Sequence, residues 1–169
     1  TCALPISNGC YAFGGWSLTS GGAKAYNDGA TVAAGFSGPT TLYAVWTATT
    51  NGCTITYYDN YGTPNATATQ SFTAGIAVAL SGTFTRTGYT LSGWATTTTG
   101  AVAYATNASP TFTTATSLYA VWTAVSYVVT WDSQSGSAVA NTSYTVVTGV
   151  ADPGSPTRTG YTFQGWFLA

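Results

Sequence analysis

The feature that most constrains this chain is an internal repeat. Six consecutive residues, Leu42–Thr47 with the sequence Leu-Tyr-Ala-Val-Trp-Thr, recur unchanged at Leu118–Thr123, 76 positions later. The segment Thr85–Thr90 recurs at Thr157–Thr162, 72 positions later. Self-similarity at a fixed period means that one small structural unit is used several times. The chain therefore consists of units of about 75 residues and not of one large domain.

Other elements recur in the same order. Both copies of Thr-Arg-Thr-Gly-Tyr-Thr lead to a Gly-Trp pair, and a third Gly-Trp pair follows Tyr11. Cys53–Tyr57 and Tyr127–Trp131 are similar segments rich in strand-forming residues, and each precedes an Asp. This order predicts three parts: residues 1–49 as the C-terminal part of a unit, 50–124 as a complete unit, and 125–169 as the N-terminal part of a unit. We call them the N-terminal, middle and C-terminal repeats.

The composition favours strands over helices. Thr, Val, Tyr, Trp and Phe are abundant, and these residues fit a pleated sheet, whereas Gly, Asn, Asp and Pro mark turns. In an extended Leu118–Thr123 the side chains of Leu118, Ala120 and Trp122 share one face of the sheet. We therefore predict a mainly β chain with little or no helix, in which one face of this strand builds a core.

The recurring aromatic and glycine residues are predicted to be structural. A buried aromatic side chain removes about 150–250 Å² from water, which is a large contribution for a unit of this size. A glycine before Trp is expected to let the indole lie over the backbone of a neighbouring strand. The alternative is that exposed aromatic rings form a platform on which sugars stack. The structural motif residues are Trp16, Trp46, Gly93, Trp94, Tyr119, Trp122, Gly165 and Trp166.

Charged side chains are scarce, with three Lys or Arg and four Asp in 169 residues, and His and Glu are absent. So few cations cannot neutralise a run of phosphates, so we expect no nucleic-acid partner and no binding to anionic membranes. No stretch is apolar for long enough to insert into a membrane. Without His or Glu there is no Ser-His pair, so we expect no enzyme activity, no cofactor and no metal. Near-neutral chains associate readily, which suits a filament or a surface layer.

The three cysteines and three glycosylation patterns suggest covalent modification. A disulfide between Cys2 and Cys10, across a short loop, is the favoured interpretation. Alternatively, Cys10 and Cys53 are small buried apolar residues. Asn-x-Ser/Thr patterns, which can accept an N-glycan, stand at Asn65, Asn107 and Asn141.

The combined pattern resembles the Listeria-Bacteroides repeat family, also called the internalin B-repeat. The resemblance rests on the strand followed by Asp and Gly, on residues 156–166, and on the Leu118–Thr123 strand, and it covers nearly the whole chain. It implies a small β-grasp-like unit, similar to ubiquitin, in an extracellular bacterial surface protein. The N-terminal repeat departs from the family pattern because Ser7–Cys10 replaces Thr-Arg-Thr-Gly. The low charge is unlike the Lys-rich members and argues against glycosaminoglycan binding.

These observations favour a structural module on a cell surface. We expect a stalk, filament or surface layer whose partners are neighbouring copies or adjacent repeats. Incomplete units at both ends suggest head-to-tail completion, in which the C-terminal half-unit of one subunit is completed by the N-terminal half-unit of the next. The alternative is an adhesin module that binds a host protein or a glycan through exposed aromatic side chains.

Overall fold

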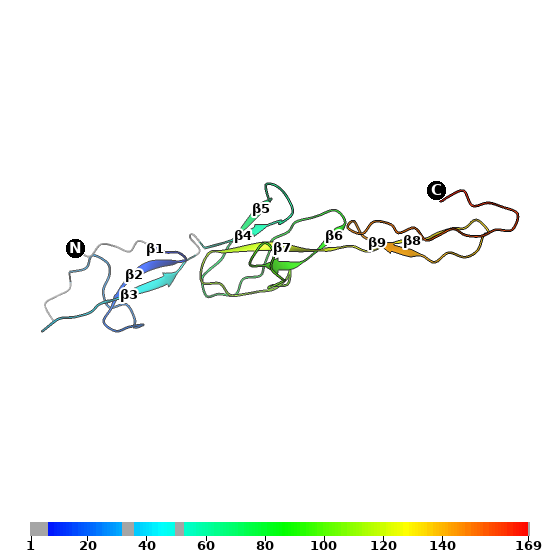
Figure 1. The fold of residues 1–169 in the computed structure, drawn as a ribbon. Coiled ribbons are helices and arrows are strands. Elements are labelled where there is room, and N and C mark those ends of the chain that lie inside the picture. The colour runs from blue at the N-terminus through cyan, green and yellow to red at the C-terminus, as the bar shows by residue number, and fades with distance from the viewer. Residues whose placement is uncertain (1–6, 32–35, 50–52, 169) are drawn as a thin grey trace. The chain divides into compact units, whose positions relative to one another are not determined.

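The computed structural model describes residues 7–31, 36–49 and 53–168 (Figure 1). These residues form strands, turns and extended segments, and none of them lies in a helix, so the prediction of a mainly β chain is confirmed. Three small sheets are present, and each lies within one of the three repeats defined above. The strands are β1 (Ser7–Asn8), β2 (Tyr11–Ser17), β3 (Tyr43–Ala48), β4 (Thr54–Tyr58), β5 (Thr67–Ser71), β6 (Tyr89–Ala95), β7 (Thr116–Ala124), β8 (Tyr127–Val129) and β9 (Thr142–Tyr144).

The middle repeat contains the largest sheet, with the strand order β5-β4-β7-β6. β4 and β5 form an antiparallel hairpin in which Thr54 faces Ser71 and Tyr58 faces Thr67. β4 and β7 are parallel, with Tyr57 opposite Leu118. A parallel pair needs a long connection, and the chain between β4 and β7 supplies it by forming the two outer strands.

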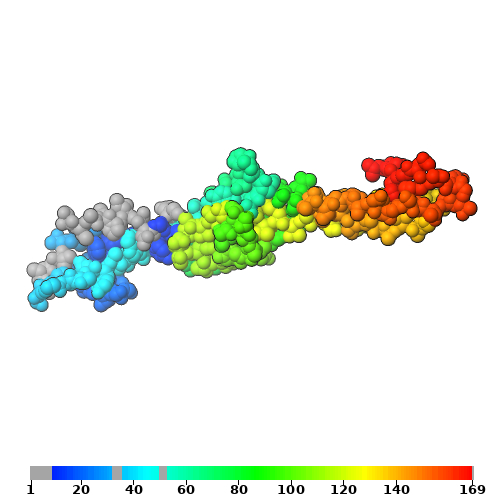
Figure 2. Space-filling model, viewed as in Figure 1, coloured from blue at the N-terminus to red at the C-terminus, as the bar shows by residue number. Residues whose placement is uncertain are grey.

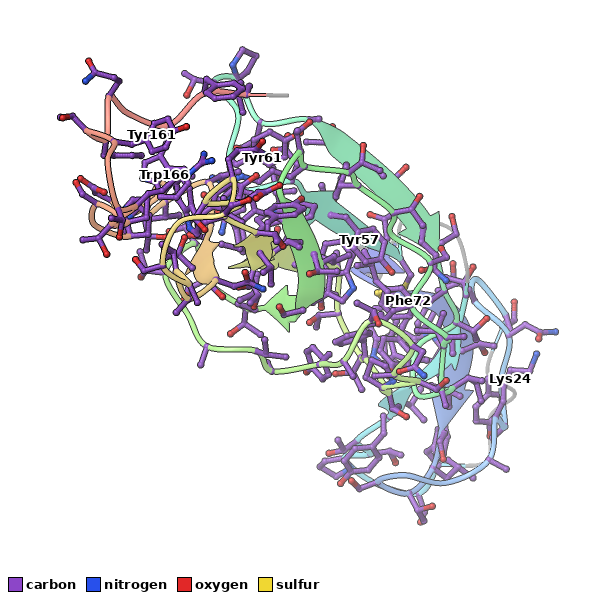
Figure 3. All side chains as sticks on the ribbon, turned by 90° about the vertical axis from the view of Figure 1, so that its right-hand side faces the viewer. Lys24, Tyr57, Tyr61, Phe72, Tyr161 and Trp166 are labelled. Carbon is purple, nitrogen blue, oxygen red and sulfur yellow. A yellow bond between two sulfur atoms is a disulfide. The ribbon has the colours of Figure 1, made fainter. Side chains whose placement is uncertain are left out.

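One face of this sheet is covered and forms the core. Ile55, Tyr57 and Leu118 alternate with exposed or half-buried neighbours along their strands and are at most 1% exposed, as is Ala120. Trp94 is fully buried, and its ring lies 4.7 Å from that of Tyr57. Figure 3 shows Tyr57 and Phe72 among the crowded side chains of this region. The alternation of buried side chains is the one that the sequence predicted for Leu118 and Ala120.

The N-terminal repeat forms a three-stranded sheet in the order β1-β2-β3. β2 and β3 are antiparallel, with Tyr11 opposite Ala48 and Ser17 opposite Tyr43, and the register shifts between Phe13 and Gly15. The ring of Phe13 contacts those of Trp16 and Trp46, at 5.0 and 5.7 Å between centroids. This pair of strands corresponds in sequence to β6 and β7, which are also neighbours in their sheet.

The described residues of the C-terminal repeat form two strands, β8 and β9, which are antiparallel. Tyr127 faces Tyr144 and Val129 faces Thr142. From Thr145 to Leu168 the chain contains turns and extended segments without a strand. β8 and β9 correspond to β4 and β5 of the middle repeat, because Val129 and Trp131 match Ile55 and Tyr57.

The predicted Cys2–Cys10 disulfide is wrong, because Cys10 is bonded to Cys53. Their Cα atoms lie 4.9 Å apart, within the usual range for a disulfide, although 43 positions separate them in the sequence. Cys10 pairs with Cys53 because the fold brings the start of β2 close to the start of β4. Both cysteines are buried, as the alternative interpretation expected, and Cys2 lies outside the described residues.

The chain divides into two compact units, one made of Thr1–Phe84 and Ser92–Val121 and the other of Thr85–Leu91 and Trp122–Ala169. The first unit contains the disulfide and the Tyr57–Trp94 core. The second contains β8, β9 and the segment that follows them.

Candidate functional site

The Gly-Trp element has the same backbone structure in the N-terminal and middle repeats. The amide of Trp94 donates to the carbonyl of Tyr104 at 2.8 Å, and the amide of Tyr104 donates back to Trp94 at 3.0 Å. Trp16 and Tyr26 exchange the same two hydrogen bonds, at 2.8 and 3.0 Å. Each Trp is therefore fixed by a loop that returns ten residues later to pair with it.

The glycine before each of these Trp residues makes that pairing sterically possible. Gly93 has φ of 152°, and a Cβ there would lie 2.5 Å from the carbonyl oxygen of Tyr104. Gly15 is enclosed in the same way by Tyr26. Gly165 has a similar φ of 135°, but no described atom lies within 4 Å of its Cβ position. The C-terminal repeat thus keeps the backbone conformation without the neighbour that requires it.

In two repeats a polar side chain of the second strand forms a hydrogen bond with an aromatic residue that lies in the first strand or just after it. In the middle repeat the Tyr57 hydroxyl donates to the side-chain oxygen of Gln70, and Gln70 donates to the carbonyl of Ala79 at 2.8 Å. In the C-terminal repeat the indole N–H of Trp131 donates to the hydroxyl of Thr142 at 3.0 Å. Burial raises the pKa of the Tyr57 hydroxyl above its ordinary value of 10.0, against smaller lowering effects from hydrogen bonds with Ser81 and Gly82.

The identical strands Leu42–Thr47 and Leu118–Thr123 have different surroundings. Leu118 and Ala120 are 0% and 1% exposed, and Tyr119 stacks on Tyr58 with 4.9 Å between ring centroids. In the N-terminal repeat, Leu42 is half-buried and Ala44 is exposed. The two strands differ in their neighbours, because β4 pairs with β7 on one of its edges. Among the predicted motif residues, Trp94 is buried, whereas Trp16, Trp46, Tyr119, Trp122 and Trp166 are half-buried.

The C-terminal repeat contains an apolar cavity of about 610 Å³. Trp131 and Trp166 lie against it, with 4.9 Å between their ring centroids. Phe167 and Leu168 at its margin are 84% and 99% exposed. In Figure 2 the last described residues, in red, stand away from the orange body of the same unit and leave the surface hollowed.

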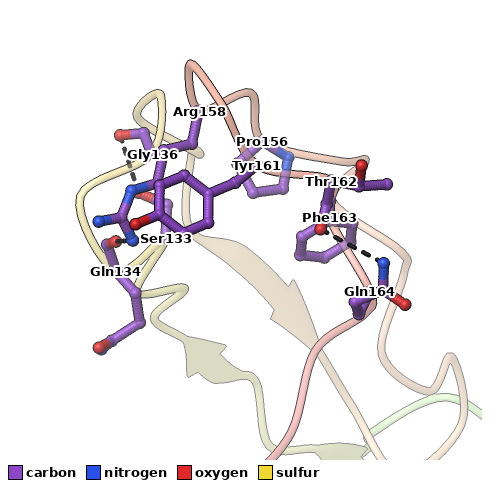
Figure 4. A pocket seen from close by; sticks show the side chains of 9 residues that line it. All are labelled: Ser133, Gln134, Gly136, Pro156, Arg158, Tyr161, Thr162, Phe163 and Gln164. Atoms are coloured by element: carbon purple, nitrogen blue, oxygen red, sulfur yellow. Dashed lines mark hydrogen bonds between the residues drawn. The ribbon is translucent and has the colours of Figure 1, made fainter.

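A second, smaller cleft of about 170 Å³ lies in the same repeat (Figure 4). The guanidinium of Arg158 covers one face of the Tyr161 ring at 4.1 Å and donates to the carbonyl of Gln134 at 3.0 Å. Asp132 accepts hydrogen bonds from the backbone and side chain of Gln134 at 2.9 and 2.8 Å, so it fixes the turn after β8. Phe163 and Gln164 line the cleft beside Tyr161.

The described residues contain neither a metal-ligand cluster nor a membrane-spanning helix. They contain no group of three or more His, Cys, Asp or Glu side chains that could hold a metal ion. No helix long and apolar enough to cross a membrane occurs in that part of the chain. The three predicted glycosylation acceptors, Asn65, Asn107 and Asn141, are exposed, and their modification stays a prediction.

Comparison with known protein families shows to which family the chain belongs. The family model of the Listeria-Bacteroides repeat domain matches three stretches, residues 5–45, 54–121 and 127–169. The chain belongs to the Listeria-Bacteroides repeat family. This family is generally found in bacterial surface proteins. No curated protein and no solved structure matches the chain.

Some structural residues of this family member escaped the sequence analysis. Tyr26 and Tyr104 each pair with a Trp, and the signal was visible as an Ala-Tyr dipeptide that ends ten residues after each of these two Trp residues. Gln70 and Thr142 gave no such signal because their residue types differ. Only the strand register shows that they occupy equivalent places, opposite Ile55 and Val129.

Proposed function

We propose that the chain is a structural repeat module of an extracellular microbial surface protein, that it forms a stalk, filament or surface layer, and that it is not an enzyme. The observation that carries the proposal is the use of the recurring residues. Trp94 and Leu118 are buried in the middle repeat, and Gly93 is enclosed by a backbone carbonyl. These recurring residues are explained by the structure of the unit. None of the three is needed as a reactive group.

We infer further that the unit is β-grasp-like. The order β5-β4-β7-β6, with the parallel pair β4–β7 at the centre and the antiparallel hairpin β4–β5 at one edge, supports this assignment because the resemblance implies a ubiquitin-like sheet. In this chain the connection from β5 to β6 contains no helix; residues 72–88 run as extended segments and turns. Phe72 and Leu80 from this connection are 3% and 7% exposed, so they cover the core where a helix would otherwise lie.

The disulfide and the surface chemistry support an extracellular location. Disulfides persist in oxidising surroundings and are rare in the cytosol, and Cys10–Cys53 is buried. A surface of Thr, Ser, Asn and Gly with four Asp and three basic side chains repels other copies weakly. Such a surface suits molecules that are held close together in a layer or fibre.

Immunogold electron microscopy of intact cells that make the protein tests this function. Antibodies against the purified chain are expected to label the cell surface, on filaments or as a continuous layer. Shaving intact cells with a protease should remove the label, and a cytoplasmic protein serves as the control that survives shaving. Label found only after the cells are broken would contradict the proposal.

An adhesin module is the second candidate, favoured by the cleft beside Tyr161. This side chain is 68% exposed, and Phe163 and Gln164 add an apolar surface and hydrogen-bonding groups next to it. Aromatic rings beside amide groups suit the stacking and hydrogen bonding of a sugar. Binding on a glycan array that disappears with Tyr161→Ala but persists with Tyr127→Ala would favour the adhesin. Arrays without binding would leave the structural module alone.

A further inference from the structure

The same four-residue turn precedes the Gly-Trp element in each repeat. In the middle repeat the amide of Tyr89 donates to the carbonyl of Arg86 at 3.0 Å. In the N-terminal repeat Asn8 faces Tyr11 across the corresponding turn between β1 and β2. The turns span residues 8–11, 86–89 and 158–161. We call the third residue of each turn the turn position, and it is occupied by Cys10, Gly88 and Gly160.

The glycine of this turn stands one residue earlier in the N-terminal repeat. Gly88 and Gly160 hold the turn position with φ of 77° and 78°, a conformation that favours glycine. In the N-terminal repeat Gly9 has φ of 58°, and the φ of Cys10, which follows it, is not positive. The turn position can therefore carry a side chain there without backbone strain. This shift accounts for Ser7–Cys10 standing where the family pattern has Thr-Arg-Thr-Gly.

In the second compact unit, the turn position of the middle repeat lies against the C-terminal repeat. The carbonyl of Gly88 accepts a hydrogen bond from the amide of Val125 at 2.8 Å. A Cβ at Gly88 would lie 2.3 Å from Cγ1 and 3.3 Å from Cβ of Val146. Val146 follows β9 by two residues. The contact therefore lies at the open end of the β8–β9 hairpin, which is the end where the first strand begins and the second strand ends.

In the first compact unit, the turn position of the N-terminal repeat makes the equivalent contact with the middle repeat. The carbonyl of Cys10 accepts from the amide of Thr49 at 3.0 Å, and Thr49 stands 76 positions before Val125. The sulfur of Cys10 is bonded to Cys53, which directly precedes β4. The carbonyl of Cys53 accepts from the amide of Phe72, directly after β5, at 3.1 Å. The disulfide therefore reaches the open end of the β4–β5 hairpin, so both pairs of repeats are joined at the same place.

We propose that the turn position is the point at which each repeat docks on the hairpin of the next, and that Cys10–Cys53 is a covalent lock at this joint which carries tension past the N-terminal sheet. Cys10 directly precedes β2 and Cys53 follows β3, so the closed loop contains both strands. Tension applied to the chain on either side passes from Cys10 to Cys53 through the two sulfur atoms. It therefore does not load the β2–β3 ladder. The inference rests on the proposed structural function, because a stalk or filament is a molecule under tension.

The joint between the middle and C-terminal repeats has no such bond among the described residues. It consists of the contact between Gly88 and Val146 and the hydrogen bond from Val125. Tension along this part of the chain runs through β6, β7, β8 and β9, which all lie between the two contacting residues. Forced unfolding follows the rate at which hydrogen-bonded strands separate, and a covalent bond does not yield in that way. The lock therefore protects the sheet of the N-terminal repeat and leaves the other sheets to respond to load.

Transfer of the lock to the second joint tests whether the two joints are equivalent. In a Cys2→Ser background, Gly88→Cys with Val146→Cys places two Cβ atoms near the separation of roughly 3.5–4.5 Å that disulfides have. Mild oxidation should join them within the monomer, as measured by loss of free thiols in mass spectrometry. Adding Thr87→Gly copies the Gly9–Cys10 arrangement and should give the same bond without a side chain at positive φ. The matched control replaces Val146 by its exposed neighbour, Val147→Cys, and should cross-link at least tenfold less. Equal yields from Val146→Cys and Val147→Cys, or no bond in either version, would overturn the shared joint.

Single-molecule force spectroscopy of the purified 169-residue chain tests the load path. With handles at both ends, the oxidised chain should extend by about 150 Å less than Cys10→Ser with Cys53→Ser, because the 43 positions that the bond spans stay closed. The double variant should also show one more unfolding event, from the β2–β3 sheet. Cys2→Ser is the control and should extend like the unchanged chain.

Two results would overturn the lock. One is an oxidised chain that extends as far as the double variant. The other is a double variant that gains the length without a further unfolding event, because the β2–β3 sheet would then bear no load. Surface labelling of cells does not depend on this bond, so failure of the lock and failure of the proposed surface function are distinguishable.

Discussion

The middle and C-terminal repeats carry the same Gly-Trp element in different structural settings. Trp94 is fully buried beside Tyr57, whereas Trp166 is half-buried beside Trp131, although the two ring pairs have centroid distances of 4.7 and 4.9 Å. The local motif thus brings the two rings together without help from the closing strand. Burial of the Trp additionally needs β7 and the loop that returns to pair with it.

The largest expected difference between the repeats concerns these two Trp residues. Trp94→Ala should lower the free energy of unfolding of the first compact unit by about 3–5 kcal/mol, because it removes a large buried side chain and leaves a cavity. Trp166→Ala should cost about 1 kcal/mol or less, because its ring is partly in water already. Hydrogen exchange measured by mass spectrometry, peptide by peptide, gives both values. Equal losses of unfolding free energy would show that the two aromatic pairs are equally buried, which would contradict the difference between the two repeats.

The disulfide distinguishes the first compact unit from the second. Reduction, or Cys10→Ser with Cys53→Ser, should destabilise the unit that contains β2 and β4 by roughly 2–4 kcal/mol, since the bond closes a long loop in the unfolded chain. Peptides from β8 and β9 should exchange as before. The control is Cys2→Ser, which leaves this bond intact. Protection lost equally in both units would mean that they unfold together.

Much of this organisation could be predicted from the sequence because it is local or repeated. The β strands, the core face of Leu118–Ala120 and the glycine before each Trp follow from alternation and from fixed spacing. The reason for the glycine differs from the expectation that it lets the indole lie over a strand, because at Gly93 it leaves room for the Tyr104 carbonyl.

The features that could not be predicted depend on pairing between distant segments. Cys10 and Cys53 meet because two strands begin close together, and nothing local to either cysteine indicates this. The difference between Leu42 and Leu118 was also hidden, because their local sequences are identical whereas β7 has β4 as a neighbour in its sheet. Identical strands can therefore have different burial when only one of them has its partner.

The glycines before Trp94 and Trp166 allow a finer test of the same comparison. Gly93→Ala should destabilise the first unit by about 2–4 kcal/mol, because a Cβ would collide with the Tyr104 carbonyl and φ is positive. Gly165→Ala should cost only about 1 kcal/mol, from its positive φ alone. Thermal melts of both variants, each followed by the exchange of local peptides, measure the difference. A cost for Gly165→Ala as large as for Gly93→Ala would contradict the open surroundings of Gly165 among the described residues.

The smallest expected effect is a pH dependence of stability that arises from Tyr57 in the middle repeat. Burial raises the pKa of the Tyr57 hydroxyl, so the folded state keeps its proton at a pH where the unfolded chain loses it, near 10. Unfolding then releases a proton, and the stability present below pH 10 is lost as the pH rises through the pKa of the folded state. The contribution is at most about 1.4 kcal/mol per pH unit. Trp131 holds the corresponding place in the C-terminal repeat and does not titrate, so that repeat lacks this term. The free energies of unfolding of the chain and of Tyr57→Phe, measured with denaturant between pH 8 and about 11, should converge at high pH. Parallel curves over that range would show that Tyr57 is not the group responsible.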